Sequence, residues 1–521
     1  MGIIMNEQKD GYIVCHRRAV TAKDVTGEYT LPDYLPDINR LLRVSSAVGR
    51  SSSHAGSEGG VDFDGEVLFS VLYSSPDGLI KNAAFQVPFD GNLQSAESIA
   101  KGLCHSTENT VCRLQSPRRI VMKCRVVSTA SVPERQRIAP VISGKISPAD
   151  EAALERKEKQ LRYGEAGEVC VSGNVSEDIE IEGGAQGFPQ VSEIVSVTMT
   201  PCIYDAKVYD GKLVYKGDVI TELILKAATA DDLPAEYFGV QRSIPISGEA
   251  DAEGLAENTL FAADCNIYGL EYRVSADAKG ENRIMELDFE YSVCFCAFTE
   301  YGISAVGDIY SPDYETTAET ACITLRRPTK SLRFNFTASG EAPRDESDFD
   351  TVVSSSARAS CDGVTVRSGR IIIQGTADVN VILSNGAGAY TVKNFKVPLR
   401  YETDGALPSD CFPDGAMVDF DAYATALSVK TRMSRDTVAA DVETAVSLLL
   451  FTGESSDIVI SCSVMKDRPR EKTPGVMKLY YPEKNETLWD IAKTCATTEK
   501  ALTEENGITG REIPVPIVIA Q

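Results

Sequence analysis

Apolar and polar residues alternate along three long segments of the chain. These segments are 61–73 (VDFDGEVLFSVLY), 214–225 (VYKGDVITELIL) and 371–383 (IIIQGTADVNVIL), and each has a glycine near its start, at Gly65, Gly217 and Gly375. Alternation with a period of two predicts half-buried β-strands, and a shared glycine inside them predicts a bulge or a close approach of two backbones. The spacing of the glycines indicates a repeat as long as a whole domain.

A short apolar segment with a central proline follows each of these strands, at Pro88, Pro245 and Pro398. Proline cannot donate to a β-ladder, so we expect these segments at a sheet edge or at the start of a strand. Two further strand-like runs follow in each copy, within 111–132, 265–298 and 418–451. The sequence therefore predicts a multidomain, mainly β protein with three β-rich, sandwich-like repeats.

Helices are predicted at few places in the first 475 residues, namely 92–108 and 147–165. The second segment, SPADEAALERKEKQLRYGE, has a serine and a proline at its start, acids early and bases late, which favours a helix that covers or bridges two repeats. We divide the chain into an N-terminal arm (1–23), repeat 1 (24–146), a charged helix or linker (147–166), repeat 2 (167–312), repeat 3 (320–464), a basic linker (465–475) and a terminal unit (476–521).

The pattern changes in the terminal unit to strand, helix, helix, strand. Residues 478–483 are predicted to form a strand, and Thr487 followed by Asp490 three residues later is a capping-box arrangement. Apolar residues then fall on one helical face, and a second helix is predicted over 497–506 before a closing strand. We expect a small βααβ unit.

The charge balance excludes some functions. Fifty-two Lys and Arg against 76 Asp and Glu give a formal net charge of −24, which disfavours binding to nucleic acid or to anionic polymers. The sequence predicts no transmembrane segment and no secretory signal. Fourteen cysteines are scattered without a repeated spacing, so we expect free thiols in a reducing cytosol, with Cys294 and Cys296 on one face of a strand.

The sequence contains no recognised catalytic motif. The three histidines, His16, His54 and His105, stand apart, and no phosphate-binding loop, metal-ligand spacing or nucleophile motif occurs. We predict a protein that is not an enzyme, with no catalytic residue, no metal and no cofactor.

The segment LPDYLPDI, with Pro32, Asp33, Pro36 and Asp37, resembles the opening signature of the SPOCS domain, a domain of sporulation proteins in anaerobic spore-formers. SPRRIVMKC, with Arg118 and Arg119, resembles a basic strand of the same domain. The two Pro-Asp steps are also explained as a proline-fixed turn, so a structural role for the signature, including Gly65, Gly217 and Gly375, is favoured over partner binding.

The terminal unit is similar to a LysM domain. Tyr480 or Tyr481 and the residues Thr487, Leu488, Trp489, Ile491, Ala492, Leu502 and Asn506 match the family pattern, whereas Asn485 and Glu486 replace its Gly-Asp step. In glycan-binding members the loops around these positions form a groove for N-acetylglucosamine chains. The candidate partner-binding or glycan-binding residues are Asn485, Glu486, Thr487, Trp489, Asn506 and Ile508. Trp489 is the only tryptophan, and we give equal weight to a packing role and to a partner-binding role for its side chain.

Three SPOCS-like repeats and a LysM-like end together resemble the spore-coat morphogenetic proteins of anaerobic spore-formers. The resemblance implies a scaffold in the mother-cell cytoplasm at the forespore surface, where the LysM-like end docks the stage IV sporulation ATPase and the repeats recruit or space other coat components. The alternative is a protein of the cell wall or cortex that binds peptidoglycan through the same end.

Overall fold

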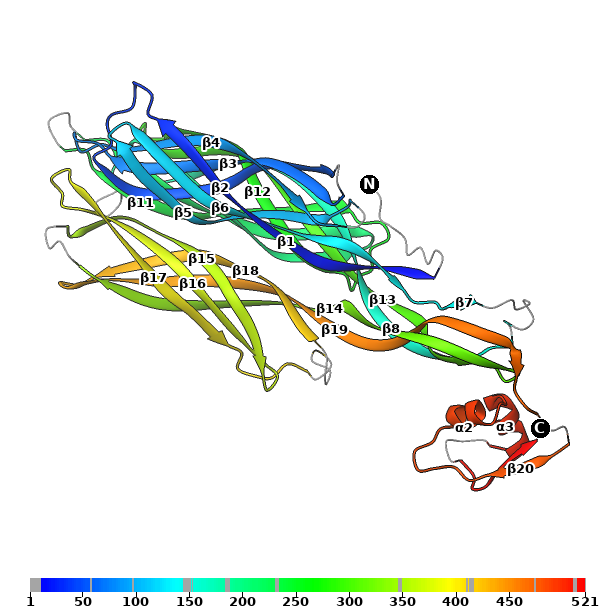
Figure 1. Ribbon diagram of the computed structural model, residues 1–521. Coiled ribbons are helices and arrows are strands. Elements are labelled where there is room, and N and C mark those ends of the chain that lie inside the picture. The colour runs from blue at the N-terminus through cyan, green and yellow to red at the C-terminus, as the bar shows by residue number, and fades with distance from the viewer. Residues whose placement is uncertain are drawn as a thin grey trace.

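The protein is mainly β in the computed structural model (Figure 1). The structure describes residues 1–521 except for residues 1–10, 57–58, 96–97, 144–150, 152, 183–187, 230–233, 345–348, 409–410, 412–416, 473–474, 509–512 and 521. The predicted mainly β, multi-sheet fold is confirmed.

Six strands form two three-stranded antiparallel sheets, and this arrangement occurs three times along the chain; in the third set one short parallel strand adds to one of the sheets. The first set comprises β1 (Tyr12–Thr30), β2 (Arg40–Ala55), β3 (Val61–Ser74), β4 (Ile80–Leu93), β5 (Lys101–Ser116) and β6 (Arg119–Arg137). The second comprises β8 (Glu155–Glu180), β9 (Val191–Tyr209), β10 (Lys212–Ala227), β11 (Tyr237–Asp251), β12 (Leu260–Ala276) and β13 (Asn282–Tyr310). The third comprises β14 (Tyr314–Pro343), β15 (Thr351–Arg367), β16 (Arg370–Ser384), β17 (Tyr390–Glu402), β18 (Met417–Met433) and β19 (Thr437–Pro469).

Each set has the same strand order in its sheets. The first, sixth and fifth strands form one sheet, as in β1-β6-β5, and the second, third and fourth form the other, as in β2-β3-β4. The two sheets of a set pack face to face around apolar side chains. Each set is therefore a six-stranded sandwich.

The aligned glycines lie in the central strands β3, β10 and β16. A register shift occurs in the neighbouring strand beside each one: between Val48 and Ser51 in β2, between Lys216 and Gly217 in the β9–β10 pair, and between Cys361 and Gly363 in β15. A Cβ added at Gly375 would lie 2.2 Å from the carbonyl oxygen of Ser360. The prediction of a bulge or a close backbone approach is thus confirmed: a bulge lies beside each glycine, and Gly375 also has the close approach.

The proline segments lie where the sequence places them. Pro88 is in β4, Pro245 in β11 and Pro398 in β17, and each of these strands is the edge of its sheet. Their positions follow from the missing N–H, which would break the ladder in a central strand.

The three sets meet at one end of the molecule, which we call the tip, through equivalent side chains. Positions seven residues after the aligned glycines, Leu72, Ile224 and Ile382, belong to one buried cluster. We call this cluster the tip plug, and its other buried members are Leu42, Val195 and Val353 from the second strands and Ile80, Tyr237 and Tyr390 from the fourth. Three equivalent patches thus close one end of the assembly.

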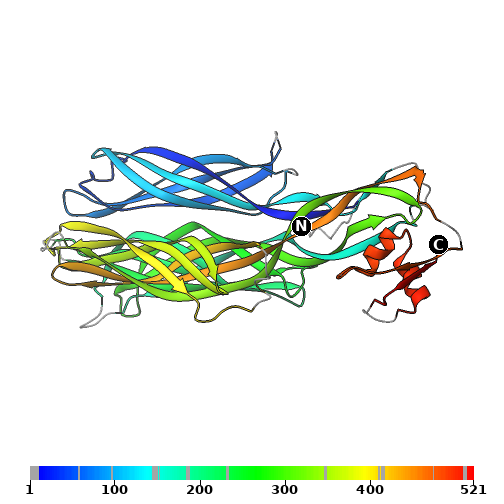
Figure 2. The ribbon, with the colours of Figure 1, turned by 60° about the horizontal axis from the view of Figure 1, so that its bottom comes forward.

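At the opposite end the first and sixth strands of the sets continue as two-stranded ribbons that form a stalk (Figures 1 and 2). The stalk has its own apolar core, which joins Ile13 of β1, Tyr163 of β8 and Ile323 of β14. β19 has 33 residues. At about 3.3 Å per residue it spans about 110 Å, so the molecule is a long rod. The short strand β7 (Val141–Ser143) pairs with β19 in the stalk.

Several predicted boundaries are wrong. Residues 101–108 of the predicted helix at 92–108 belong to β5, and residues 155–165 of the predicted helix at 147–165 belong to β8, whereas residues 147–150 lie outside the described part of the chain. Residues 12–23 of the predicted arm pair with β6, and residues 465–469 of the predicted linker continue β19. These polar segments form ribbons because one of their faces packs in the sandwich or the stalk.

The cysteine prediction also needs correction. Cys170 of β8 and Cys294 of β13 face each other across the ladder and form a disulfide. Cys296, two residues further on, is a free buried thiol.

Candidate functional site

The terminal unit has the predicted element order. It comprises β20 (Met477–Tyr480), α2 (Leu488–Thr494), α3 (Glu499–Asn506) and β21 (Ile517–Ala520), and β20 pairs antiparallel with β21. The capping box is present: Thr487 Oγ1 accepts a hydrogen bond from the Asp490 N–H at 3.3 Å, and the Thr487 N–H donates to Asp490 Oδ2 at 2.9 Å. Local sequence rules therefore fix the start of α2.

Trp489 is buried against the end of the stalk, with 3% of its surface exposed. Its indole N–H donates to Asp308 Oδ2 at 2.7 Å, and its ring lies edge-on to Tyr310 with 4.9 Å between the ring centroids. Lys493 Nζ lies 2.8 Å from both oxygens of Asp308. The structure thus places Trp489 in an interface within the chain.

A bulge in β13 positions the Asp308 carboxylate. The β8–β13 register shifts between Val306 and Asp308, which leaves Gly307 as the extra residue. Burial opposes ionisation of Asp308, but hydrogen bonds from Lys493 and Trp489 outweigh it, and the pKa of this carboxyl is lowered. Asp308 is therefore an ionised anchor for the terminal unit.

Most of the other predicted residues of the terminal unit hold the unit together. Glu486 accepts hydrogen bonds from the Tyr480 hydroxyl at 2.7 Å and from the Glu483 N–H at 2.9 Å. Asn506 exchanges two bonds of 2.7 Å with the backbone of Val518. Asn485 is exposed with a φ of 75°, and Ile508 is half-buried. Residues 509–512, which follow Ile508, lie outside the described residues.

The outer face of β20 carries apolar side chains that the sequence reading missed. Met477 is 71% exposed, Leu479 57% and Tyr481, directly after β20, 65%. Val515, two residues before the partner strand β21, is also exposed. We call these four residues the terminal strip. The alternation of Met477, Leu479 and Tyr481 was the available signal, because three apolar residues two positions apart lie on one face of a strand, whereas Lys478 and the half-buried Tyr480 take the other.

The LPDYLPDI segment forms the connection between β1 and β2 at the tip. Arg118 holds it: its guanidinium donates to Asp37 Oδ1 at 2.8 Å, to the Pro32 carbonyl at 2.8 Å and to the Leu35 carbonyl at 3.1 Å. The Tyr73 hydroxyl donates to the Pro36 carbonyl at 3.0 Å. These contacts give Arg118, Pro36 and Asp37 scaffolding positions in this connection.

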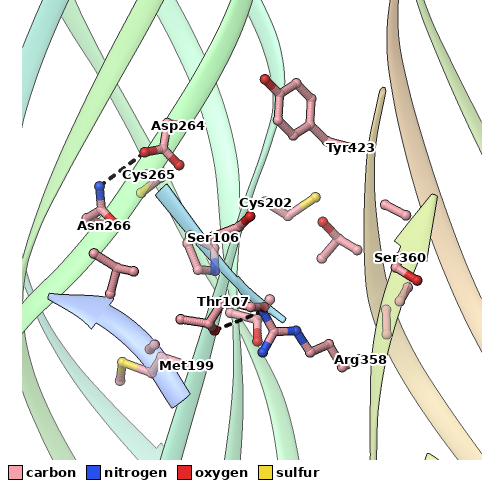
Figure 3. Close-up of a pocket in the computed structure, with 18 of the residues that line it drawn as sticks. Ser106, Thr107, Met199, Cys202, Asp264, Cys265, Asn266, Arg358, Ser360 and Tyr423 are labelled. Carbon is pink, nitrogen blue, oxygen red and sulfur yellow. Dashed lines mark hydrogen bonds between the residues drawn. The ribbon is translucent and has the colours of Figure 1, made fainter. Parts of the chain in front are cut away.

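A large cavity of about 2530 Å³ lies between the three sets. Its walls come mainly from the second and fifth strands of each set: β2, β5, β9, β12, β15 and β18. Figure 3 shows Ser106, Asp264, Arg358 and Tyr423 in this space. Arg358 Nη2 donates to Thr107 Oγ1 at 3.1 Å and so links the third set to the first across the wall. No periodicity in the sequence predicts this cavity, because it exists only where the three sets meet.

Comparison with known proteins gives no relative: no family model, no curated protein and no solved structure matches the chain. No helix among the described residues is long and apolar enough to cross a membrane. Within the same residues there is no group of three or more His, Cys, Asp or Glu side chains arranged to hold a metal ion.

Proposed function

We propose that the chain is a non-enzymatic scaffold of spore-coat assembly, in which the three sandwiches are SPOCS-like repeats and the terminal unit is LysM-like. In this proposal the protein works in the mother-cell cytoplasm at the forespore surface. The terminal unit docks onto the morphogenetic ATPase there, and the rest of the rod recruits or spaces further coat components.

The terminal strip is the observation that carries the proposal. Apolar side chains gathered on one exposed face favour a protein partner over solvent. The opposite side of the unit, with Trp489, is fixed to the stalk through Asp308. A partner that docks on the strip therefore leaves the contact between the terminal unit and the stalk intact. The rod then holds its tip at a fixed distance from that partner. The resemblance of LPDYLPDI and of the terminal unit to the two families supports the sporulation context.

Co-purification of the full-length protein with the sporulation ATPase tests this function. Tyr481→Glu places a charge in the terminal strip, and we expect it to weaken binding at least tenfold. Tyr209→Glu is the matched control, because Tyr209 is a similarly exposed tyrosine (74%) at the end of β9. Binding of Tyr481→Glu at the wild-type level would overturn the proposed docking face.

Retention of the wild-type protein on purified peptidoglycan, without any binding to the ATPase, would instead favour the wall-binding alternative. The same two variants separate the cases, since a glycan site in the loops around Asn485 does not require the terminal strip.

A further inference from the structure

The cavity between the three sandwiches is surrounded by sheet edges. All residues from 41 to 50 of β2 and from 197 to 207 of β9 line it, whereas β3 contributes only the alternate residues Glu66, Leu68 and Ser70. A strand seen face-on shows every second residue, and a strand seen edge-on shows every residue. The cavity therefore faces the edges of β2 and β9.

Each of these edge strands has one hydrogen-bonded neighbour among the described strands. β2 pairs only with β3, β9 only with β10, and β12 only with β13. The other edge of such a strand carries ladder N–H and C=O groups without a strand partner. An edge of this kind is a template for an additional strand.

β12 offers the longest regular edge that lies wholly in the cavity wall. Its residues 260 to 268 all line the cavity, and they pair with β13 in one unbroken register, from Leu260 opposite Phe298 to Tyr268 opposite Glu290. Phe261, Ala263, Cys265 and Ile267 pack against the core of the second sandwich. Asp264 and Asn266, which are hydrogen-bonded to each other at 3.2 Å, project from the other face (Figure 3).

The dimensions of the cavity suit one extended chain. The lining stretch of β9 has 11 residues, from 197 to 207. At about 3.3 Å per residue it is about 35 Å long, so a volume of about 2530 Å³ corresponds to a mean cross-section of about 70 Å². A strand with its side chains occupies about 4.8 by 10 Å, or about 50 Å². Small-molecule pockets, at about 300–1,000 Å³, are much smaller than this cavity.

We infer that the central cavity binds an extended polypeptide segment of a partner protein, which adds as a strand to the free edge of β12. The segment spans the nine residues of the regular edge, and its backbone supplies the missing ladder bonds. Its side chains alternate between the polar face with Asp264 and Asn266 and the opposite face of the new strand. This site is separate from the terminal strip, so its partner is recruited independently of docking by the terminal unit.

A phage-displayed library of random twelve-residue peptides, selected on the full-length protein, tests the inference. We expect enriched peptides with period-two alternation. We expect their binding to fall at least tenfold in Ser106→Trp/Ser360→Trp, which fills the cavity, but not in Ser176→Trp, whose exposed serine on β8 lies outside it. Bound peptide should also slow alkylation of the half-buried Cys265 in the wall and leave Cys322, which is exposed on β14, unchanged.

Backbone N-methylation of an enriched peptide at alternate positions provides a second measurement, made on the wild-type protein in case the filled variant does not fold. Loss of the donors should weaken binding at least tenfold if the peptide adds as a strand. No enriched peptide, equal binding to the filled and wild-type proteins, or equal binding of the N-methylated peptide would overturn the inference.

Discussion

The Asp308 carboxylate helps to fix the terminal unit to the rod, beside Arg470, whose guanidinium donates to the Lys493 carbonyl at 3.0 Å. Asp308 accepts the indole N–H of Trp489 and pairs with Lys493, and Tyr310 beside it donates from its hydroxyl to the Thr497 carbonyl at 2.9 Å. Loss of a charged hydrogen-bond partner in a half-buried site costs about 1–3 kcal/mol. The attachment of the unit is therefore sensitive to one residue.

Asp308→Ala should release Trp489 from this interface. Because Trp489 is the only tryptophan, its fluorescence reports this contact directly. We expect a red-shifted emission and faster quenching by acrylamide. Asp313→Asn is the control, since Asp313 pairs with Lys472 at 2.6 Å in the same region without a hydrogen bond to the indole. An unchanged emission in Asp308→Ala would show that other contacts suffice.

The same emission should depend on pH. The folded-state pKa of Asp308 is lowered, so its stabilising effect is complete above the ordinary aspartate pKa and is lost as pH falls through the lower folded value. The red shift should therefore begin only below pH about 3.9.

Residues with local roles could be predicted and residues with distant partners could not. Thr487 and Asp490 are three positions apart, so the capping box is visible in the sequence. Asp308 and Trp489 are 181 positions apart, and nothing near Asp308 indicates its role. Trp489 could be singled out, but its burial depends on the stalk.

At the level of elements, a buried ion pair joins the first and second sandwiches. Arg43 of β2 lies 3.3 Å from Glu222 of β10, and its guanidinium also donates to Ser196 and Thr198 of β9. Burial raises the pKa of Glu222 from 4.5 to about 7, although Arg43 opposes the shift. Between pH about 4.5 and 7, the Glu222 carboxyl is therefore protonated in the folded protein and ionised in the unfolded chain.

Stability should fall between pH about 4.5 and 7 because of this contact. The folded state binds more protons than the unfolded state over that range, so the free energy of unfolding decreases as pH rises. Glu222→Gln removes the effect, and its stability relative to the wild type should rise over the range by an amount of the order of 3 kcal/mol. Urea midpoints across pH measure it, with Glu193→Gln, in the more exposed pair with Lys81, as control. Parallel curves for Glu222→Gln and the wild type would contradict the prediction.

Element types could be predicted where one face of a segment is consistently apolar. The strands at 61–73, 214–225 and 371–383 meet that condition. The helix prediction at 147–165 failed because its Lys and Glu residues satisfy helix rules, whereas Leu161 and Tyr163, two positions apart, pack in the stalk core. In so polar a ribbon, the tertiary contact decides the structure.

At the scale of the whole molecule, the arrangement of the three sandwiches depends on residues that the sequence aligns but does not place together. Leu72, Ile224 and Ile382 occupy equivalent positions, and each alone is an ordinary apolar residue of a strand. Their contact in the tip plug closes one end of the cavity and makes three similar units into one body. A repeat therefore predicts the units, and only their shared surfaces determine the assembly.

The tip plug should couple the stabilities of the sandwiches. Replacement of Leu72, Ile224 or Ile382 by alanine should each cost about 2–5 kcal/mol, because each side chain is buried. Because these residues contact one another in one cluster, truncating two of them enlarges the same space. The changes in the free energy of unfolding of the double variants, measured by urea denaturation, should therefore depart from the sum of the single changes by about 0.5–3 kcal/mol. Leu72→Ala combined with Ile323→Ala in the stalk core should be additive, since these residues belong to different clusters. If the plug pairs were additive as well, the plug would not couple the three sandwiches, and their assembly would depend on other contacts such as the Arg43–Glu222 pair and the Arg358–Thr107 bond.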